Sequence, residues 1–267
     1  MLLRLHIEKQ NARRREHFFS RLYSSPKRAL LLDYDGTIAP FCANRNRAVP
    51  DPLVRQLLSE IHISDNTRVV IITGRPAHDL LPLLDMDGLE IWGCHGLERL
   101  RPDGTHEVAA VGIETLEQIS KANELLMQHG LSRFLEFKRA ATAIHWRGME
   151  TAAKEVAQSV EKVWSELASH EGLEMLPFDG GLEIRATTRN KGDVVRAIIH
   201  DSGWGASIAY LGDDQTDEDA FAALQGFGLS VLVRNEYRPT LADIWVRPPR
   251  ELVGFLEEWT TACRGER

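Results

Sequence analysis

The chain has 267 residues, of which 43% are hydrophobic and 27% charged, so it can bury a large core, and a disordered chain or a collagen-like fibre is excluded. Its 32 basic and 39 acidic residues give a net charge of −7, which offers no general attraction for nucleic acid or an anionic membrane. The three cysteines, Cys42, Cys94 and Cys263, lack C-x-x-C spacing, and no apolar run is long enough to cross a membrane, so we expect a cytoplasmic protein without disulfides or a zinc cluster.

The first elements in chain order have the pattern of a β-α-β unit. Residues 1–27 mix apolar and charged residues without the apolar stretch of a signal peptide, and we expect a helical extension there. An apolar run at residues 28–32 predicts a buried parallel strand. An amphipathic helix separates it from a second buried run at residues 69–72, and a third strand is expected at residues 89–92. These elements favour the α/β class with a parallel sheet.

The pattern changes after a turn signal at residues 101–104. Two units follow, each with the periodicity of a helix and then of paired strands. We therefore expect an α+β cap over residues 110–188, inserted into a core that comprises residues 28–109 and 189–267. From Lys191 onward the α/β pattern returns, and its strands complete the first sheet.

Several polar side chains follow the expected parallel strands or open a helix. The ligand crevice of an open parallel sheet lies at the carboxyl ends of its strands, so these side chains should face one another. Singly, each has an ordinary explanation as a turn residue, a helix N-terminal acid or a surface lysine. They are Asp33, Asp35, Thr73, Gly74, Arg75, Lys191, Asp213, Asp214 and Asp217.

The Thr73 hydroxyl beside Gly74 and the Lys191 ammonium beside Gly192 are groups that can hold a phosphoryl group, and the carboxylates indicate chemistry next to it. Asp33 and Asp35 stand two residues apart, so both can point to one side, where one can attack and the other handle protons. Asp213 and Asp214 end an apolar run, and further carboxylates near Asp33 would repel one another unless a divalent cation lay among them. Hard oxygen ligands beside an expected phosphate favour Mg²⁺.

In this order the motifs resemble the haloacid-dehalogenase-like phosphatase superfamily, and their details resemble its trehalose-6-phosphate phosphatase family. The resemblance covers about residues 28–255 and implies a Rossmann-like core with an inserted α+β cap, and a Mg²⁺-dependent phosphatase of trehalose 6-phosphate. The motifs are Asp33-Tyr-Asp-Gly-Thr37, Ile72-Thr-Gly-Arg75, His95-Gly-Leu-Glu98, Glu136-Phe-Lys138, His145-Trp-Arg147, Glu183-Ile-Arg185, Lys191-Gly192 and Gly212-Asp-Asp-Gln-Thr-Asp-Glu-Asp-Ala-Phe221.

The resemblance also implies a role for each matching residue. Asp33 would be the nucleophile that forms an aspartyl-phosphate, and Asp35 the acid and base. Thr73 and Lys191 would neutralise phosphoryl oxygens. Asp33, the Asp35 carbonyl and Asp213 would bind Mg²⁺, with Asp214 and Asp217 around it. The substrate-binding set would be Gly74, Arg75, His95, Glu136, Lys138, His145, Arg147, Glu183 and Arg185.

Two alternatives remain open from the sequence. Phosphatases of other glycosyl phosphates, such as glucosyl- or mannosyl-glycerate phosphate, share the core motifs. A non-catalytic module that binds a sugar phosphate and regulates a synthase would be expected to lose Asp33, Asp35 or Lys191, and none is lost. The expected partner is a small-molecule sugar phosphate, not nucleic acid or a membrane. A monomer is compatible with the sequence, which does not indicate an oligomeric state.

Overall fold

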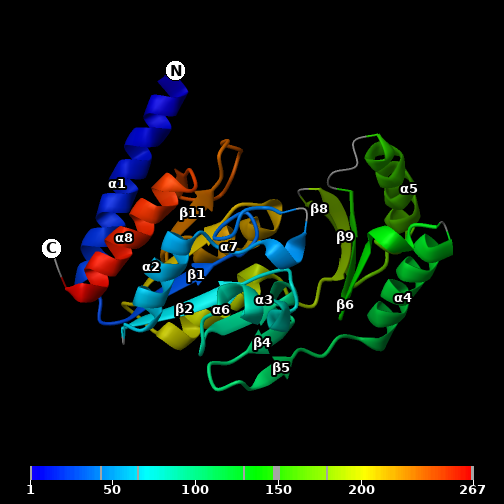
Figure 1. Cartoon of the computed structure of the whole chain (residues 1–267), viewed down its shortest axis with the longest axis horizontal. Coiled ribbons are helices and arrows are strands. Elements are labelled where there is room, and N and C mark those ends of the chain that lie inside the picture. Colours follow the sequence, from blue (N-terminus) through cyan, green and yellow to red (C-terminus); the bar gives the residue numbers. More distant parts are fainter. Residues whose placement is uncertain are drawn as a thin grey trace.

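The structure, a computed structural model, describes residues 2–42, 44–64, 66–128, 130–146, 151–178 and 180–265. The described strands form two separate sheets (Figure 1). The larger has the order β12-β11-β10-β1-β2-β3-β4-β5, and the smaller the order β6-β7-β9-β8. The α/β class and the inserted α+β layer are therefore both present.

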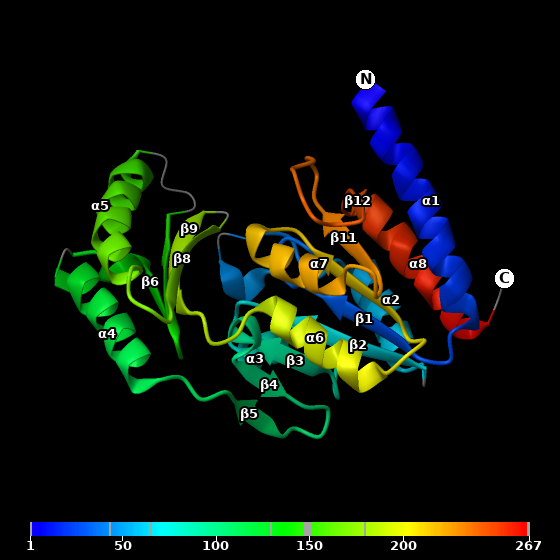
Figure 2. The ribbon, with the colours of Figure 1, turned by 180° about the vertical axis from the view of Figure 1, so that it is seen from behind.

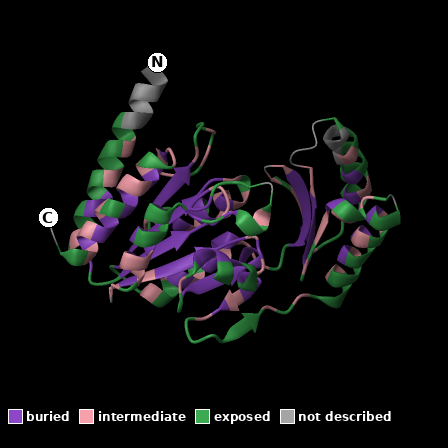
Figure 3. Cartoon of the chain, in the orientation of Figure 1, coloured by how far each residue is buried: buried purple, intermediate pink, exposed green. Residues whose placement is uncertain are grey.

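Six strands of the large sheet pair in parallel. They are β1 (Arg28–Leu32), β2 (Thr67–Ile72), β3 (Glu90–Gly93), β10 (Ser207–Gly212), β11 (Leu229–Val233) and β12 (Ile244–Val246). Every residue of β1, β10 and β11 is buried (Figure 3), which explains why these strands read as continuous apolar runs. Leu32 pairs with Ile71 on one side and with Leu211 on the other, so the loops after β1, β2 and β10 leave the sheet together.

Helices cover both faces of this sheet. One face packs against α1 (Leu2–Ser24), α2 (Pro52–His62), α3 (Ala77–Leu84) and α8 (Arg250–Arg264). The other packs against α6 (Lys191–Ser202) and α7 (Glu218–Leu224), which Figure 2 shows from their own side. In the described part of the chain, no helix combines the length and apolar character needed to cross a membrane.

The far edge of the large sheet differs from the sequence prediction. The short strands β4 (Glu98–Leu100) and β5 (His106–Val108) extend it by antiparallel pairing from β3. The turn signal at residues 101–104, where the α/β pattern was expected to end, is the loop of this hairpin. Strands of three residues carry too few positions for a hydrophobic alternation to be recognised.

The small sheet belongs to the two expected helix-plus-hairpin units. The first is α4 (Ile113–Gln128) with β6 (Leu135–Lys138) and β7 (Ala141–His145). The second is α5 (Ala152–Leu167) with β8 (Leu173–Phe178) and β9 (Gly181–Ala186). Both helices pack on one face of the sheet, where Trp164 joins Ile144 and Ile184 in the core of the cap. The opposite face is turned toward the large sheet (Figure 1).

Helix α1 packs along α8 (Figure 2). Aromatic side chains make this contact. The Phe19 ring lies 5.1 Å from that of Phe255 and 6.4 Å from that of Trp259, measured between ring centres. The side chain of Phe19 is 1% exposed, so it belongs to the main core.

Phe19→Ala is expected to lower the free energy of unfolding by about 3–5 kcal/mol, because it removes a buried ring and leaves a cavity. Urea denaturation followed by far-UV circular dichroism measures the change. Ser20→Ala, at the next and exposed position of α1, is the control and should shift stability by less than about 0.5 kcal/mol. Equal stability of the Phe19 variant and the wild type would mean that α1 does not unfold cooperatively with the core.

Candidate active site

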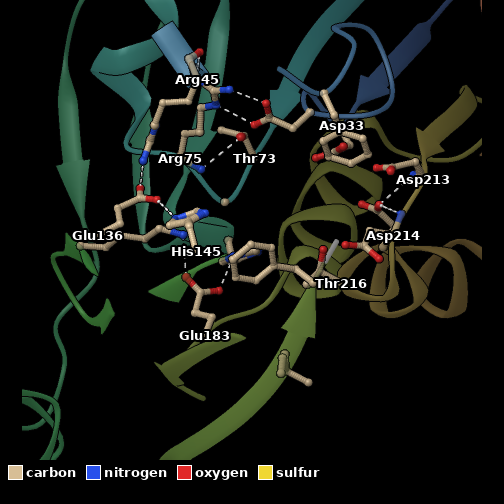
Figure 4. Close-up of a pocket in the computed structure, with 18 of the residues that line it drawn as sticks. Asp33, Arg45, Thr73, Arg75, Glu136, His145, Glu183, Asp213, Asp214 and Thr216 are labelled. Carbon is tan, nitrogen blue, oxygen red and sulfur yellow. Dashed lines mark hydrogen bonds and ion pairs between the residues drawn. The ribbon is translucent and has the colours of Figure 1, made fainter. Parts of the chain in front are cut away.

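A cavity of about 530 Å³ lies between the carboxyl end of the large sheet and the facing side of the small sheet. Figure 4 shows its walls, with aspartates on the core side and glutamates on the cap side. Of the residues that the sequence singled out, the cavity brings together Asp33, Asp35, Thr73, Gly74, Arg75, His95, Glu136, Lys138, His145, Glu183, Lys191, Asp213, Asp214 and Asp217.

Asp33, immediately after β1, is held by the residues around it. Lys191 Nζ donates to Asp33 Oδ1 over 2.6 Å, and Thr37 Oγ1 donates to Oδ2 over 3.0 Å. Burial raises the pKa of Asp33 to about 7, although the Lys191 ammonium opposes this shift. Lys191 is fixed in turn at the first turn of α6, which Asn190 and Asp193 close with a capping box.

A second buried carboxylate, Asp213, stands beside Asp33 at the end of β10. Burial, together with the charges of Asp33 and Asp217, raises the pKa of Asp213 well above its usual value. The approach is close enough to require Gly36, which has φ +86°, since a Cβ there would lie 2.2 Å from Asp213 Oδ2.

This cluster has the chemistry of a divalent-cation site. Oxygen atoms of Asp33, Asp213 and Asp217 lie within 4.8 Å of one another, and all three residues are buried. The Lys191 ammonium contacts the cluster, and it pairs with Asp33 and Asp217 rather than Asp213. When all three carboxylates are ionised they carry more negative charge than this ammonium balances, and hard carboxylate oxygens suit Mg²⁺.

Asp217 differs from Asp33 and Asp213, because each of its carboxylate oxygens accepts two hydrogen bonds from other groups of the protein. Its Oδ1 accepts from Lys191 Nζ at 2.7 Å and from Tyr210 Oη at 2.6 Å. Its Oδ2 accepts from the backbone N–H groups of Asp213 and Asp214, each at 2.9 Å. Burial alone would raise the pKa of Asp217, but Lys191 and these hydrogen bonds hold it below its usual value. Asp217 thus braces the loop that carries Asp213.

Asp35 is paired with Arg75. Arg75 Nε donates to Asp35 Oδ2 over 2.6 Å, and Nη2 donates to Oδ1. Arg75 Nη1 also donates to the backbone carbonyl of Arg45 over 2.8 Å. The sequence placed Arg75 in the substrate-binding set, whereas in the structure its guanidinium is committed to Asp35. An acid–base role for Asp35 therefore requires its carboxylate to exchange this partner for the reacting oxygen.

Thr73 and Gly74, after β2, pack against His95. The backbone N–H of His95 donates to the Thr73 carbonyl over 2.9 Å, and a Cβ on Gly74 would lie 2.6 Å from the His95 ring. Cys94, His95 and Gly96 all have positive φ, of 48°, 56° and 104°. This left-handed turn aims the imidazole of His95 across the cavity toward the cap.

Two cap carboxylates, Glu136 on β6 and Glu183 on β9, face the core from strands on either side of β7. Glu136, Ala143 and Glu183 form one row across β6, β7 and β9, and the small Ala143 leaves space between the two glutamates. Glu183 Oε1 accepts from Lys138 Nζ at 2.6 Å, and Oε2 lies 3.0 Å from His95 Nε2. Burial would raise the pKa of Glu183, but Lys138 and His95 outweigh it and hold this pKa well below the usual range.

His95, which contacts Glu183, is neutral at physiological pH. Burial lowers the pKa of His95 to about 4, although Glu183 opposes the shift. Because Glu183 is ionised and can only accept, a neutral His95 must donate from Nε2. Nδ1 of His95 is buried without a hydrogen-bond partner among the described residues.

Two residues of the expected substrate-binding set are not among the described residues that line the cavity. Arg147 lies outside the described residues. Arg185 does not line the cavity; its Nε donates to Glu174 Oε1 on β8 over 2.8 Å, and the two residues are cross-strand neighbours. Arg185 thus takes the structural role of an ion pair between strands.

The cavity also includes residues that sequence reasoning missed, among them Phe41, Cys42, Arg45, Phe178 and Thr216. Thr216 lies within the motif of residues 212–221, in which the sequence gives a role to the aspartates and none to this threonine. The loop of residues 41–45 has neither periodicity nor a recognisable motif, so no pattern in the chain pointed to Arg45.

The fold, with Asp33, Thr73, Lys191 and Asp213 at one edge of the large sheet, is the fold of a class of proteins, the haloacid-dehalogenase-like hydrolases. A hydrolase of this class from B. subtilis superposes with a TM-score of 0.60 at 12% identity, over 86% of this chain and 99% of its own. Within the class, the family model for trehalose-phosphatase matches residues 31–242, and the chain belongs to that family.

Two relatives illustrate the likeness. The trehalose-phosphate phosphatase of Mycobacterium marinum is 29% identical over 241 residues, which cover 86% of this chain and 60% of that protein. The chain thus spans less than two thirds of the length of this relative. The C-terminal domain of the C. albicans trehalose-6-phosphate phosphatase superposes with a TM-score of 0.79 at 20% identity, over 92% of this chain and 96% of that one. At this identity the superposition shows the fold.

Proposed function

We propose that this protein is a Mg²⁺-dependent phosphatase that hydrolyses trehalose 6-phosphate to trehalose and phosphate. The observation that carries the proposal is one cavity that joins the buried pair of Asp33 and Lys191 to the cap carboxylates Glu136 and Glu183. The core side has the groups for phosphoryl transfer, and the cap side has groups that can bind sugar hydroxyls.

The reaction proceeds in two displacements at phosphorus. Asp33 attacks the phosphoryl group, the bond from phosphorus to the sugar oxygen breaks, and Asp35 gives its proton to that oxygen. Asp35 then takes a proton from a water molecule, which attacks the aspartyl-phosphate and releases phosphate while Asp33 is regenerated. The side chains of Asp33 and Asp213 and the main-chain oxygen of Asp35 would hold Mg²⁺, with Asp214 and Asp217 supporting them, and the ion would supply charge neutralisation for the phosphoryl oxygens.

Thr73 and Lys191 complete this neutralisation. The Lys191 ammonium is buried, and although burial lowers its pKa, Asp217 and Asp33 raise that pKa above the usual value, so it remains charged. A fixed, buried cation stabilises the charge that spreads over the equatorial oxygens in the transition state. The Thr73 hydroxyl and the backbone at Gly74 donate to the same oxygens.

The disaccharide lies against the cap. Glu136, Lys138 and Glu183 contact its hydroxyls, and His95, Arg75 and His145 border the same space. The ionised state of both glutamates supports this assignment, because charged acceptors make strong hydrogen bonds to hydroxyl groups. In the structure these groups pair with one another, so the sugar must replace some of those contacts.

Two other functions remain as alternatives. A different glycosyl phosphate would use the same core and differ in its contacts with Glu136 and Glu183. A regulatory module without catalysis is disfavoured by the retained set of Asp33, Asp35 and Lys191. We further infer a cytoplasmic setting from three free, widely separated cysteines.

A phosphate-release screen with Mg²⁺ tests the proposal. It compares trehalose 6-phosphate with glucose 6-phosphate, glucosyl- and mannosyl-glycerate phosphates and p-nitrophenyl phosphate, each over a range of concentrations. We expect the wild-type protein to have its highest kcat/KM for trehalose 6-phosphate. A higher value for another glycosyl phosphate would reassign the substrate, and no release from any of them would favour the regulatory module.

Glu183→Gln is expected to lower kcat/KM for trehalose 6-phosphate about tenfold to a hundredfold. The amide keeps the shape of the side chain, but the loss of a hydrogen bond to a charged group costs about 1.5–3 kcal/mol. Turnover of p-nitrophenyl phosphate should change far less, because this substrate does not reach the cap.

Steady-state kinetics with both substrates measures the difference. Glu161→Gln, an exposed position on α5 of the same cap, is the matched control. Parallel losses on the two substrates would count against a sugar-binding role for Glu183.

A further inference from the structure

Arg45 connects the core to the cap through contacts on both sides. It lies in a short 3₁₀ turn, Arg45–Arg47, that is capped by Asn44. On the core side its carbonyl accepts from Arg75 Nη1 at 2.8 Å, and its Nη2 lies 3.2 Å from Asp79 Oδ2 on α3. On the cap side its Nη1 pairs with Glu136 Oε1 on β6. Figure 4 shows this guanidinium reaching from the core loop to Glu136.

The ion pair determines how Glu136 is held. One carboxylate oxygen of Glu136 faces Arg45, and the other lies 2.7 Å from His145 Nε2 on β7. Burial would raise the pKa of Glu136, but His145, Lys138 and Arg45 outweigh it and lower this pKa to about 2. The carboxylate is therefore ionised and oriented from both sides, by a residue of the core and a residue of the cap.

The backbone of Arg45 is connected to the proposed acid–base residue Asp35 through Arg75. Arg75, which donates to the Arg45 carbonyl, also forms the bidentate pair with Asp35. The side chain of Arg75 is 7% exposed, so this anchor lies within the protein rather than at its surface. One residue thus links the backbone next to the phosphoryl site with a carboxylate on the cap.

We infer that Arg45 is a specificity-determining positioning residue, which fixes Glu136 at a set distance from the phosphoryl site. A phosphate ester bound with its phosphorus facing Asp33 then presents its sugar to Glu136 only if the sugar spans that distance. This role rests on the proposed function, since it treats Glu136 as a sugar contact. It assigns the choice of substrate partly to the core loop of residues 44–47 and not to the cap alone.

The experiment is the kinetics of Arg45→Ala on trehalose 6-phosphate and on p-nitrophenyl phosphate. We expect KM for trehalose 6-phosphate to rise about tenfold to a hundredfold, with a much smaller change in kcat, because ground-state contacts with the sugar are weakened. The aryl phosphate should respond far less. Arg45→Lys retains the cation without the planar fork and should restore part of the loss.

Arg47→Ala is the matched control, since Arg47 is exposed in the same 3₁₀ turn and should leave both substrates unaffected. The double variant of Arg45→Ala with Glu136→Gln tests the coupling between the two residues. If Arg45 acts through Glu136, the double variant should lose little more than the more severe single variant. Thermal melting of each variant shows that the fold is retained.

Three results would overturn the inference: equal losses on both substrates, additive losses in the double variant, or an unchanged KM for trehalose 6-phosphate. Failure of the proposed function is recognised separately, because the wild type itself would then not hydrolyse trehalose 6-phosphate. In that case the same variants are assayed on the glycosyl phosphate that the wild type hydrolyses best, and the same criteria apply.

Discussion

Asp33→Asn is expected to reduce phosphate release by on the order of a thousandfold or more while leaving the fold intact. The amide has the size and shape of the carboxylate; its oxygen can still accept from Lys191, and its NH2 group can donate to the Thr37 hydroxyl, which then acts as the acceptor. It cannot act as a carboxylate nucleophile. Burial already opposes the ionised form of Asp33, since it raises the pKa of this carboxyl to about 7, so a neutral amide is compatible with the site.

Phosphate release with trehalose 6-phosphate measures the loss, and thermal melting reports the fold. Asp103→Asn, in the exposed hairpin loop between β4 and β5, is the control and should retain full activity. Mass spectrometry should exclude deamidation of the introduced asparagine back to aspartate. Appreciable turnover by a variant shown to be free of aspartate at this position would rule out the covalent mechanism.

The sequence predicted those parts of the site that follow from the sheet. Asp33, Thr73 and Asp213 each come directly after a buried apolar run, and the register of β1 with β2 and β10 places all three at one edge. The cap was predictable for a similar reason, because its helices and hairpins alternate with clear periodicity. Where backbone pairing between strands fixes the position of a residue, the sequence pattern is sufficient to predict that position.

The remaining features depend on contacts between distant side chains. The pairing of Arg75 with Asp35 and the contact of Arg45 with Glu136 join loops whose conformations follow no period. Arg185 was expected in the substrate-binding set with Glu183, two residues away on β9, yet it pairs with Glu174 across the strand. A motif gives the residue type, but the partner of a long charged side chain is decided by the three-dimensional surroundings.

Removal of divalent cations is expected to stop phosphate release, and Mg²⁺ should restore it. Asp33, Asp213 and Asp217 are buried together, and a phosphate monoester brings further negative charge to the same place. The single positive charge of Lys191 does not balance this sum. Ca²⁺ should bind without supporting turnover, because its larger and more flexible shell places carboxylate oxygens less suitably for attack.

Activity and binding can be separated in this test. Chelator-treated protein should melt at a higher temperature when Mg²⁺ is added, since a ligand that binds the folded state stabilises it by RT ln(1 + [L]/Kd). Asp213→Asn removes one expected ligand charge and should weaken this stabilisation together with turnover, whereas Asp103→Asn should change neither. Asp217 differs from Asp213, because its carboxylate accepts hydrogen bonds from Lys191 and Tyr210. Asp217→Asn should therefore lower the stability of the protein even without Mg²⁺. Full activity of metal-free protein, or a melting temperature that does not respond to Mg²⁺, would contradict the assignment of this cluster as a cation site.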